Sequence, residues 1–228
     1  MITFLEAVAK ESEECLSYCR SDDFGKRANE NCLKYLVLSS IKHLASAAEF
    51  KNLFSEDLRD CIHSEWKVNF DGGNYDYLDI LVTRKGLLPD EVVKGEIAVI
   101  ELKYVPPTFF GKPKDSGFQH TDLLPLIPGR ERAWHFSNIP AVDCKYLDDY
   151  AAAMKKLTIE DIRKELKFND PEHGPKRKIS LDTLRERAQK QAEKYARALR
   201  VRCGTKVYYA TLIACGPKVD LTINSLQA

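Results

Sequence analysis

Residues 74–104 read NYDYLDILVTRKGLLPDEVVKGEIAVIELKY and contain two runs of β-forming residues separated by a polar interval. Each run carries an acidic residue where a half-buried strand normally has none. Asp79 stands inside the apolar part of the first run, and the second run ends in Glu101-Leu102-Lys103. An Asp on one strand and Glu-x-Lys on its neighbour form an arrangement that can hold a divalent cation beside a phosphodiester.

The chain has 228 residues, of which 44% are hydrophobic and 30% charged, and its formal net charge is +1. This length and composition predict one domain over residues 1–228, with a sizeable core and a charged surface. The balance of 35 basic and 34 acidic residues excludes a strongly basic protein that coats DNA. It still allows a local basic cleft.

The sequence also bears on the compartment of the protein. No apolar run approaches the roughly 20 residues of a membrane span, and the first residues lack the charged and then apolar pattern of a signal peptide. The seven cysteines are odd in number and lie mostly in apolar or helical contexts, which indicates reduced thiols in the core. We therefore expect an intracellular protein of the nucleus or cytoplasm, with no membrane partner.

Hydrophobic periodicity predicts the elements around the two runs. Helices are expected at residues 1–20, 28–48 and 181–200, and strands at residues 63–70, 77–84, 95–104 and 206–215. Short polar links favour an antiparallel meander of the first three strands, and the last strand is apolar on both faces, as central strands are. A helix between strands of one sheet implies an α/β fold, with a mixed sheet flanked by helices.

Residues 105–180 interrupt this order and are interpreted as a partly helical insertion between the third strand and the next helix. Within them, Thr158 and Asp161 form a variant of the capping box at the start of a short helix. Residues 169–178 are polar and rich in Pro and Gly, and we expect them to form a loop. Ser180 then caps the helix expected at residues 181–200.

Side-chain alternation decides whether the acids can meet. Asp79 shares a strand face with Leu81, and it can lie beside Glu101 if the two strands pair in a suitable register. Lys103 follows Glu101 on the same face, roughly 7 Å along the strand. Both carboxylates, with a main-chain carbonyl expected from Leu102, make an oxygen-only site that suits Mg²⁺ or Mn²⁺. Lys103 would orient the attacking water or stabilise the charge that develops on the phosphate.

The same residues have an ordinary structural explanation. A Glu-x-Lys pair at a strand end is commonly a solvated edge or a cross-strand ion pair. Two observations favour a site instead. Asp79 lies inside an apolar strand, where an unpaired carboxylate costs several kcal/mol, and Val99-Ile100 directly before Glu101 are typical of a buried central strand.

The helix expected at residues 181–200 carries Gln191 and Tyr195 four residues apart, on one face. An amide and a phenol there can bond a phosphate or hold the metal ligands, although both residues are also ordinary on a helix surface. Gln189 competes for the role of the amide, but it lies on a different face from Tyr195, which favours Gln191.

Asp79, Glu101-Leu102-Lys103 and Gln191-x-x-x-Tyr195, taken in this order, resemble the PD-(D/E)XK nuclease superfamily, whose core has the element order α-β-β-β-α-β. The Gln-x-x-x-Tyr helix resembles the RecB-like branch. The phrase YDYLDILVTRKG…GEIAVIELKY also resembles nuclease-like domains found beside AAA-ATPase-like modules and in mobile-element or effector proteins. The resemblance covers roughly residues 28–104 and 181–215. Leu78 stands before Asp79 where the superfamily's name has Pro, which RecB-like members often lack.

This resemblance implies a restriction-endonuclease-like fold and metal-dependent hydrolysis of a nucleic-acid phosphodiester. It assigns catalytic and supporting roles to Asp79, Glu101, Lys103, Gln191 and Tyr195. The implied metal ligands are Asp79, Glu101 and the Leu102 carbonyl. Glu30 occupies the place of a glutamate on the family's first core helix that completes the metal site, although an acid at a helix start is also commonplace.

Basic residues before and along the helix at 181–200 are candidates for nucleic-acid contacts. They are Lys176, Arg177, Lys178, Arg187, Lys190 and Lys194. Together they can line a groove that follows phosphates. The alternative is a solvated helix face, because Glu186 and Glu193 alternate with them.

The expected function is therefore that of a Mg²⁺- or Mn²⁺-dependent nuclease acting on DNA, with RNA left open as the substrate. One alternative is a nuclease-derived module that has lost catalysis and binds nucleic acid or a protein. Another is a structural subunit whose acids are merely ion-paired. A homodimer, or linkage to a larger ATPase or effector protein, is compatible with each.

Overall fold

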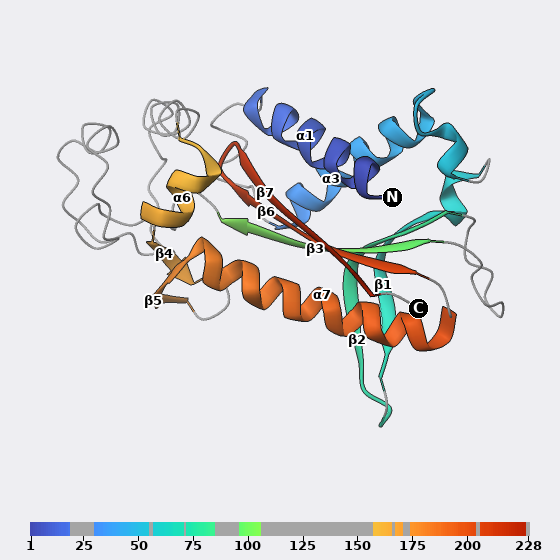
Figure 1. Cartoon of the computed structure of the whole chain (residues 1–228). Helices are drawn as coiled ribbons and strands as arrows, with labels where there is room; N and C mark the ends of the chain where they lie inside the picture. Colours follow the sequence, from blue (N-terminus) through green and yellow to red (C-terminus); the bar gives the residue numbers. More distant parts are fainter. Residues whose placement is uncertain are drawn as a thin grey trace.

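The computed structural model describes residues 1–18, 30–54, 57–70, 72–84, 96–105, 157–165, 167–170, 174–203 and 206–226. These residues form an α/β structure in which helices cover both faces of a mixed five-stranded sheet (Figure 1). Most of the insertion expected at residues 105–180 lies outside the described residues. Within the described ranges, no helix combines the length and apolar composition that crossing a membrane requires.

The elements follow the expected order with small shifts of their ends. The helices are α1 (Ile2–Tyr18), α3 (Glu30–Ser46), α6 (Ile159–Glu165) and α7 (Leu181–Cys203), with short 3-10 turns η1 (Lys51–Leu53) and η2 (Leu58–Asp60). The main sheet contains β1 (Ile62–Asn69), β2 (Tyr75–Thr83), β3 (Ile97–Val105), β6 (Val207–Cys215) and β7 (Lys218–Leu226). A separate hairpin contains β4 (Lys167–Asp170) and β5 (Gly174–Ser180).

The strand order in the main sheet is β1-β2-β3-β6-β7, with β3 in the middle. The first three strands pair antiparallel, which confirms the expected meander. β6 pairs parallel to β3 and antiparallel to β7, so it is an interior strand, as its two apolar faces predict. A parallel pair requires a crossover connection, and α7 forms the last part of it.

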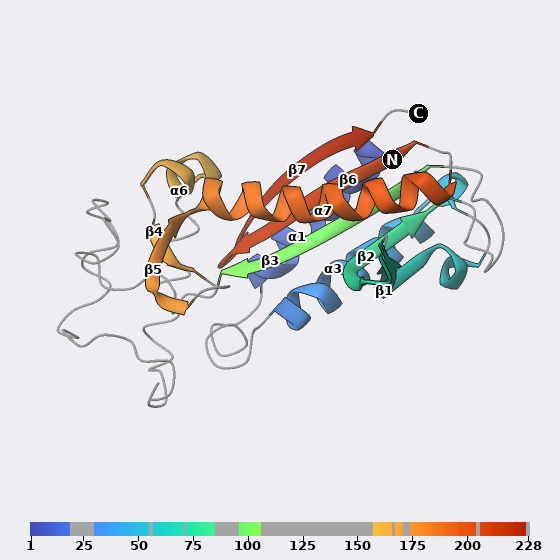
Figure 2. The same cartoon turned by 90° about the horizontal axis from the view of Figure 1, so that it is seen from below.

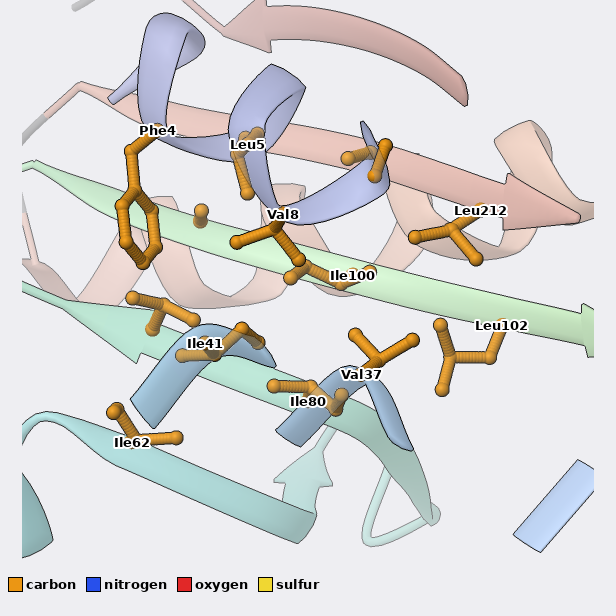
Figure 3. Close-up of a cluster of buried hydrophobic side chains, with 14 of the residues drawn as sticks. Phe4, Leu5, Val8, Val37, Ile41, Ile62, Ile80, Ile100, Leu102 and Leu212 are labelled. Atoms are coloured by element: carbon orange, nitrogen blue, oxygen red, sulfur yellow. The ribbon is translucent and has the colours of Figure 1, made fainter. Parts of the chain in front are cut away.

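α1 and α3 cover one face of the sheet, and α7 lies along the other (Figures 1 and 2). On the α1 face, Phe4, Leu5 and Val8 recur at helical spacing and pack onto the sheet (Figure 3). The Phe4 ring meets Phe50 and Phe54 edge-on, with centroids 5.3 Å and 4.9 Å away. These contacts fix α1 against the segment that follows α3.

α7 begins and ends close to its expected positions. The main-chain N–H of Thr183 donates to Oγ of Ser180 at 3.2 Å, which confirms Ser180 as the N-cap. The side that faces the sheet carries Ala188, Ala192 and Ala196, all fully buried. Small residues at this spacing let the helix lie close to the strands, which brings its polar residues near β2 and β3.

Two expectations for the C-terminal half are wrong. Of residues 169–178, expected to form a loop, the described residues 169–170 and 174–178 belong to the β4–β5 hairpin, in which Phe168 and Ile179 pair and are both buried. The strand β7 was not expected, because Gly216-Pro217 was interpreted as the end of the sheet. Gly216 instead adopts φ 57° in a turn between β6 and β7.

β2 leaves β3 part of the way along its length. The ladder between them ends at Ile80↔Ile100, whereas the ladder between β1 and β2 continues to Asn69↔Tyr75. The end of the β1–β2 hairpin therefore projects beyond the sheet as a two-stranded arm (Figure 1). The point where β2 and β3 separate is called the fork below.

The strand faces also change at the fork. Ile80 packs with the residues beneath α1 and α3, whereas Leu78 and Leu81 both pack in the cluster beneath α7. The expected regular alternation of Asp79 and Leu81 along one flat strand is therefore wrong. The cause is the twist of β2 as it leaves the sheet, because two-stranded ribbons twist more strongly than larger sheets.

Replacing Phe4 with alanine tests the packing of α1. The side chain is fully buried, so Phe4→Ala should lower the free energy of unfolding by about 3–5 kcal/mol in urea titrations. Ile2→Ala, at a position that is 46% exposed on the same helix, should change it by less than about 0.5 kcal/mol. Equal effects of the two changes would contradict the packing described.

Candidate active site

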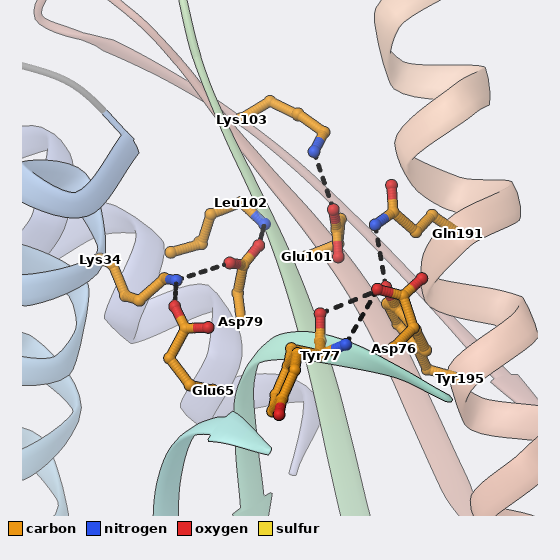
Figure 4. Close-up of polar contacts among 10 residues, drawn as sticks. All are labelled: Lys34, Glu65, Asp76, Tyr77, Asp79, Glu101, Leu102, Lys103, Gln191 and Tyr195. Carbon is orange, nitrogen blue, oxygen red and sulfur yellow. Dashed lines mark hydrogen bonds and ion pairs between the residues drawn. The ribbon is translucent and has the colours of Figure 1, made fainter. Parts of the chain in front are cut away.

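Asp79 occupies the fork between β2 and β3 (Figure 4). Its Oδ2 accepts a hydrogen bond of 2.9 Å from the main-chain N–H of Leu102, and its Oδ1 lies 2.9 Å from Nζ of Lys34. The Asp79 carboxylate thus accepts the hydrogen bond that the β2 main chain would accept if the β2–β3 ladder continued. Since the N–H and C=O of a strand residue point to the same edge, the Leu102 carbonyl lies on this edge as well.

Lys34 from α3 brings a positive charge to Asp79. Its side chain is only 10% exposed, and its ammonium also donates a hydrogen bond to Glu65 of β1. Burial alone would lower the pKa of Lys34, but the hydrogen bonds and charges of Glu65 and Asp79 outweigh burial and raise it above its ordinary value. Lys34 therefore stays charged and acts as the cation that Asp79 faces.

Glu65 reaches Lys34 at the expense of regular strand geometry. Its φ is 54°, and no other non-glycine residue in the described ranges has a positive φ. The β1–β2 ladder pairs Ser64 with Ile80 and Trp66 with Leu78, and it omits the position between them. A left-handed non-glycine residue costs roughly 1–2 kcal/mol. The ion pair with Lys34 offsets this cost.

Glu101 and Lys103 form a second, more deeply buried pair on β3. Glu101 is 1% exposed, and Nζ of Lys103 donates to its Oε1 at 2.9 Å. Burial raises the pKa of Glu101 to about 8, with Lys103 opposing the rise and the charge of Asp79 adding to it. The second oxygen, Oε2, is buried and has no hydrogen-bond partner among the described residues. An orphaned carboxylate oxygen of this kind favours a cation as its missing partner.

Glu30 is the first residue of α3 and stands one helical turn before Lys34. Its charge raises the pKa values of both Glu101 and Lys103, so it lies within electrostatic reach of the β3 pair. For Lys103, burial acts to lower the pKa, and the neighbouring carboxylates reverse that effect. The fork thus gathers acids from α3, β1, β2 and β3.

Thr211 of β6 is a further polar residue at this position. It pairs with Glu101 in the parallel β3–β6 ladder, so the two side chains lie on the same face at the strand spacing of about 4.8 Å. Its Oγ1 is buried without a hydrogen-bond partner among the described residues. Two neighbouring orphaned oxygens, on Glu101 and Thr211, thus face the α7 side of the sheet.

Gln191 and Tyr195 meet on α7, as their spacing predicts. Nε2 of Gln191 donates to Oη of Tyr195 at 3.0 Å, and that hydroxyl donates to the carbonyl of Tyr77 at 3.2 Å. Burial raises the pKa of Tyr195, so the phenol remains a donor at neutral pH. Because Tyr77 is two residues before Asp79, this chain of hydrogen bonds ties α7 to β2 beside the fork.

The basic residues expected to line a groove lie on β5 and along α7. Arg187 and Arg177 lie 2.8 Å and 3.8 Å from Oδ2 of Asp170, whose side chain is fully buried in β4. Lys194 lies over the Phe70 ring, 4.1 Å from its centroid. Lys178 is on β5 and Lys190 is exposed on α7, and the side chain of Lys176 lies outside the described residues.

The donors at the fork are carboxylate and main-chain oxygens, which are the ligands of Mg²⁺ and Mn²⁺. In the part of the chain that the structure describes, no three His, Cys, Asp or Glu side chains are already arranged as a metal site. Both oxygens of Asp79 are occupied by Lys34 and Leu102. The residues present fit such an ion if the Lys34 ammonium moves from Oδ1.

Sequence reasoning missed Lys34, Glu65 and Thr211. Lys34 had a signal, since it lies seven residues before Ile41 on the buried face of an amphipathic helix, where a lysine needs a partner. Thr211 had a weaker signal as a hydroxyl within an apolar strand. The left-handed conformation of Glu65 leaves no mark in composition or periodicity.

Comparison with models of known protein families gives no match, and comparisons with curated proteins and with solved structures give none either. The resemblance noted from the sequence therefore rests on the residues at the fork and on α7.

The buried carboxyl of Glu101 should make stability depend on pH. Its pKa is about 8 in the folded chain against an ordinary 4.5. The folded state thus holds a proton that the unfolded chain releases, and the free energy of unfolding should fall as pH rises from about 4.5 to about 8. In urea titrations with a chelator, Glu101→Gln should lose less stability over this range than the unaltered protein.

The matched control for this measurement is Glu186→Gln, at an exposed position on α7. It should follow the unaltered protein across the range. If Glu101→Gln and the unaltered protein lost stability in parallel, the carboxyl of Glu101 would not hold a proton near neutral pH.

Proposed function

We propose that this chain is a metal-dependent nuclease that hydrolyses phosphodiester bonds in DNA, with its reacting centre at the fork. The observation that carries the proposal is the convergence of Asp79 with the buried Glu101–Lys103 pair, which leaves one carboxylate oxygen without a partner. A buried carboxyl group with a raised pKa and an unpaired oxygen is typical of functional sites.

The order of the elements supports a restriction-endonuclease-like core. α3, β1, β2, β3, α7 and β6 follow one another as α-β-β-β-α-β, with β3 and β6 parallel. The three elements that carry the resemblance, β2, β3 and α7, adjoin at one place in this arrangement.

Each residue has a distinct role in this proposal. Asp79, Glu101 and the Leu102 carbonyl would hold Mg²⁺ or Mn²⁺, with Glu30 completing the set. When bound, the ion supplies Lewis acidity toward water and phosphate. Lys103 presents a charged ammonium beside Glu101, where it can orient the nucleophile or stabilise charge on the phosphate. Gln191 and Tyr195 hold β2 in position.

Removing either partner of the β3 pair tests the proposal. Glu101→Gln and Lys103→Met should each reduce cleavage of plasmid and single-stranded DNA by at least about 100-fold in Mg²⁺ or Mn²⁺, because each removes a group that stabilises the transition state. Gel assays of product formation give the rates, and circular dichroism checks the fold. Glu160→Gln, at an exposed position on α6, should leave the rate unchanged.

Retained cleavage in both site variants would contradict the assignment of the reacting centre. Cleavage of RNA alone in parallel assays would change the substrate class and keep the chemistry.

A nuclease-derived module without catalysis is the second candidate, and the Lys34 contact favours it. An ammonium shared by Asp79 and Glu65 neutralises the carboxylate that an ion would need. In such a module Lys34 would replace the metal permanently, and the fold would serve to bind nucleic acid or a protein.

Calorimetry with Mn²⁺ on the unaltered protein and on Lys34→Met separates the two candidates. For the nuclease, both should bind Mn²⁺, and Lys34→Met should bind at least about tenfold more tightly, because a like charge at roughly 4 Å costs several kcal/mol near a protein surface. Lys67→Met, two residues from Glu65, is the matched control and should bind like the unaltered protein. Absence of heat from both proteins at millimolar Mn²⁺ would favour the module.

A further inference from the structure

The outer face of the β1–β2 arm carries exposed aromatic rings. Beyond the fork, one face of the arm packs against α7 through Val68 and Leu78. The opposite face presents Tyr75, Tyr77 and Lys67, which we call the tyrosine face. Tyr75 and Tyr77 are 56% and 49% exposed, and Lys67 pairs with Tyr77 across the arm.

Such exposure is unusual for this chain. Among the described residues, Tyr75 and Tyr77 are two of four large hydrophobic residues that are exposed, the others being Ile2 and Tyr35. The two rings are neighbours, with centroids 5.8 Å apart and planes at 85°. A single exposed apolar residue needs no explanation, whereas adjacent exposed aromatic rings on a projecting element indicate a binding surface.

The lysine gives this surface a positive charge. Nζ of Lys67 lies 3.9 Å from the centroid of the Tyr75 ring. An exposed contact of this kind contributes only about 0.5–1 kcal/mol, so the ammonium can exchange it for a phosphate. Aromatic rings with an adjacent cation form the usual platform for single-stranded nucleic acid, because every base has a face that can stack.

The tyrosine face adjoins the fork along β2. Tyr75, Tyr77 and Asp79 alternate along β2, each roughly 7 Å from the next, and so follow the same face of the arm. Figure 4 shows Tyr77 beside Asp79, on the strand that continues into the site. A strand of nucleic acid lying on the rings would therefore extend toward Asp79.

We propose that the tyrosine face binds an unpaired nucleic-acid strand, with bases stacked on Tyr75 and Tyr77 and a phosphate contacted by Lys67. A paired duplex keeps its base faces stacked inside, so it cannot use these rings. The proposal deepens the proposed function by naming an unpaired strand as the substrate form, and only the link to cleavage rests on that function.

Fluorescence anisotropy with a labelled single-stranded DNA oligonucleotide and its blunt duplex tests this at low salt in a chelator, where no metal-dependent cleavage occurs. The single strand should bind more tightly than the duplex. Tyr75→Ala and Tyr77→Ala should each weaken its binding by roughly 5- to 150-fold, and Tyr→Phe at either position should largely retain it, because the ring still stacks. Lys67→Met should weaken binding and reduce its salt dependence.

Tyr35→Ala is the matched control, since Tyr35 is 75% exposed on α3 and lies outside the arm. It should bind the single strand like the unaltered protein, and circular dichroism should show that each variant is folded. Unchanged affinity in the folded Tyr75→Ala and Tyr77→Ala variants would overturn the proposal. Tighter binding of the duplex, or no binding of either probe, would also overturn it.

The cleavage assays described above keep this proposal separate from the nuclease assignment. Binding of the single strand through the tyrosines without cleavage in metal would remove the nuclease function and leave the binding surface. If cleavage and the affinity for the single strand both survived Tyr75→Ala and Tyr77→Ala, the binding surface would be removed and the nuclease function would remain.

Discussion

The hydrogen bond between the Asp79 carboxylate and the main-chain N–H of Leu102 is the contact on which the site depends. Where β2 turns away from β3, the middle strand of the sheet would otherwise expose a main-chain donor inside the protein, and a buried donor without a partner costs about 1–3 kcal/mol. A side chain from the departing strand satisfies it. The same contact keeps the arm attached to the sheet and fixes the position of one carboxylate beside β3.

The fork also contains an imbalance of charge. Among the described residues, four acids, Glu30, Glu65, Asp79 and Glu101, accompany two lysines, Lys34 and Lys103. Burial is the main cause of the raised pKa of Glu101, and the negative charges of Asp79 and Glu30 add to it, so that a proton there removes one surplus charge at the most buried position. A divalent cation would remove the same surplus without a proton. The local electrostatics thus favour added positive charge, either as a proton or as a divalent cation.

Much of the sheet could be predicted from the sequence, because β1, β2, β3 and β6 each have an apolar pattern of strand length. β7 also alternates, with Val219, Leu221 and Ile223 on one face. It was not predicted because Gly216-Pro217 was interpreted as the end of the sheet. Periodicity placed Gln191 and Tyr195 in contact, since a helix has one regular geometry. Periodicity could not predict where the Asp79 carboxylate lies. That position depends on the twist of β2 at the fork and on Lys34, a residue more than forty positions earlier in the chain.

The backbone conformation of Glu65 depends on its ion pair with Lys34. A left-handed glutamate is held only as long as its carboxylate has the Lys34 ammonium to face. If that ammonium turned away, Glu65 would relax toward an ordinary extended conformation, and the missing rung between β1 and β2 could form. The β1–β2 ladder would then run without interruption from the sheet to the tip of the arm.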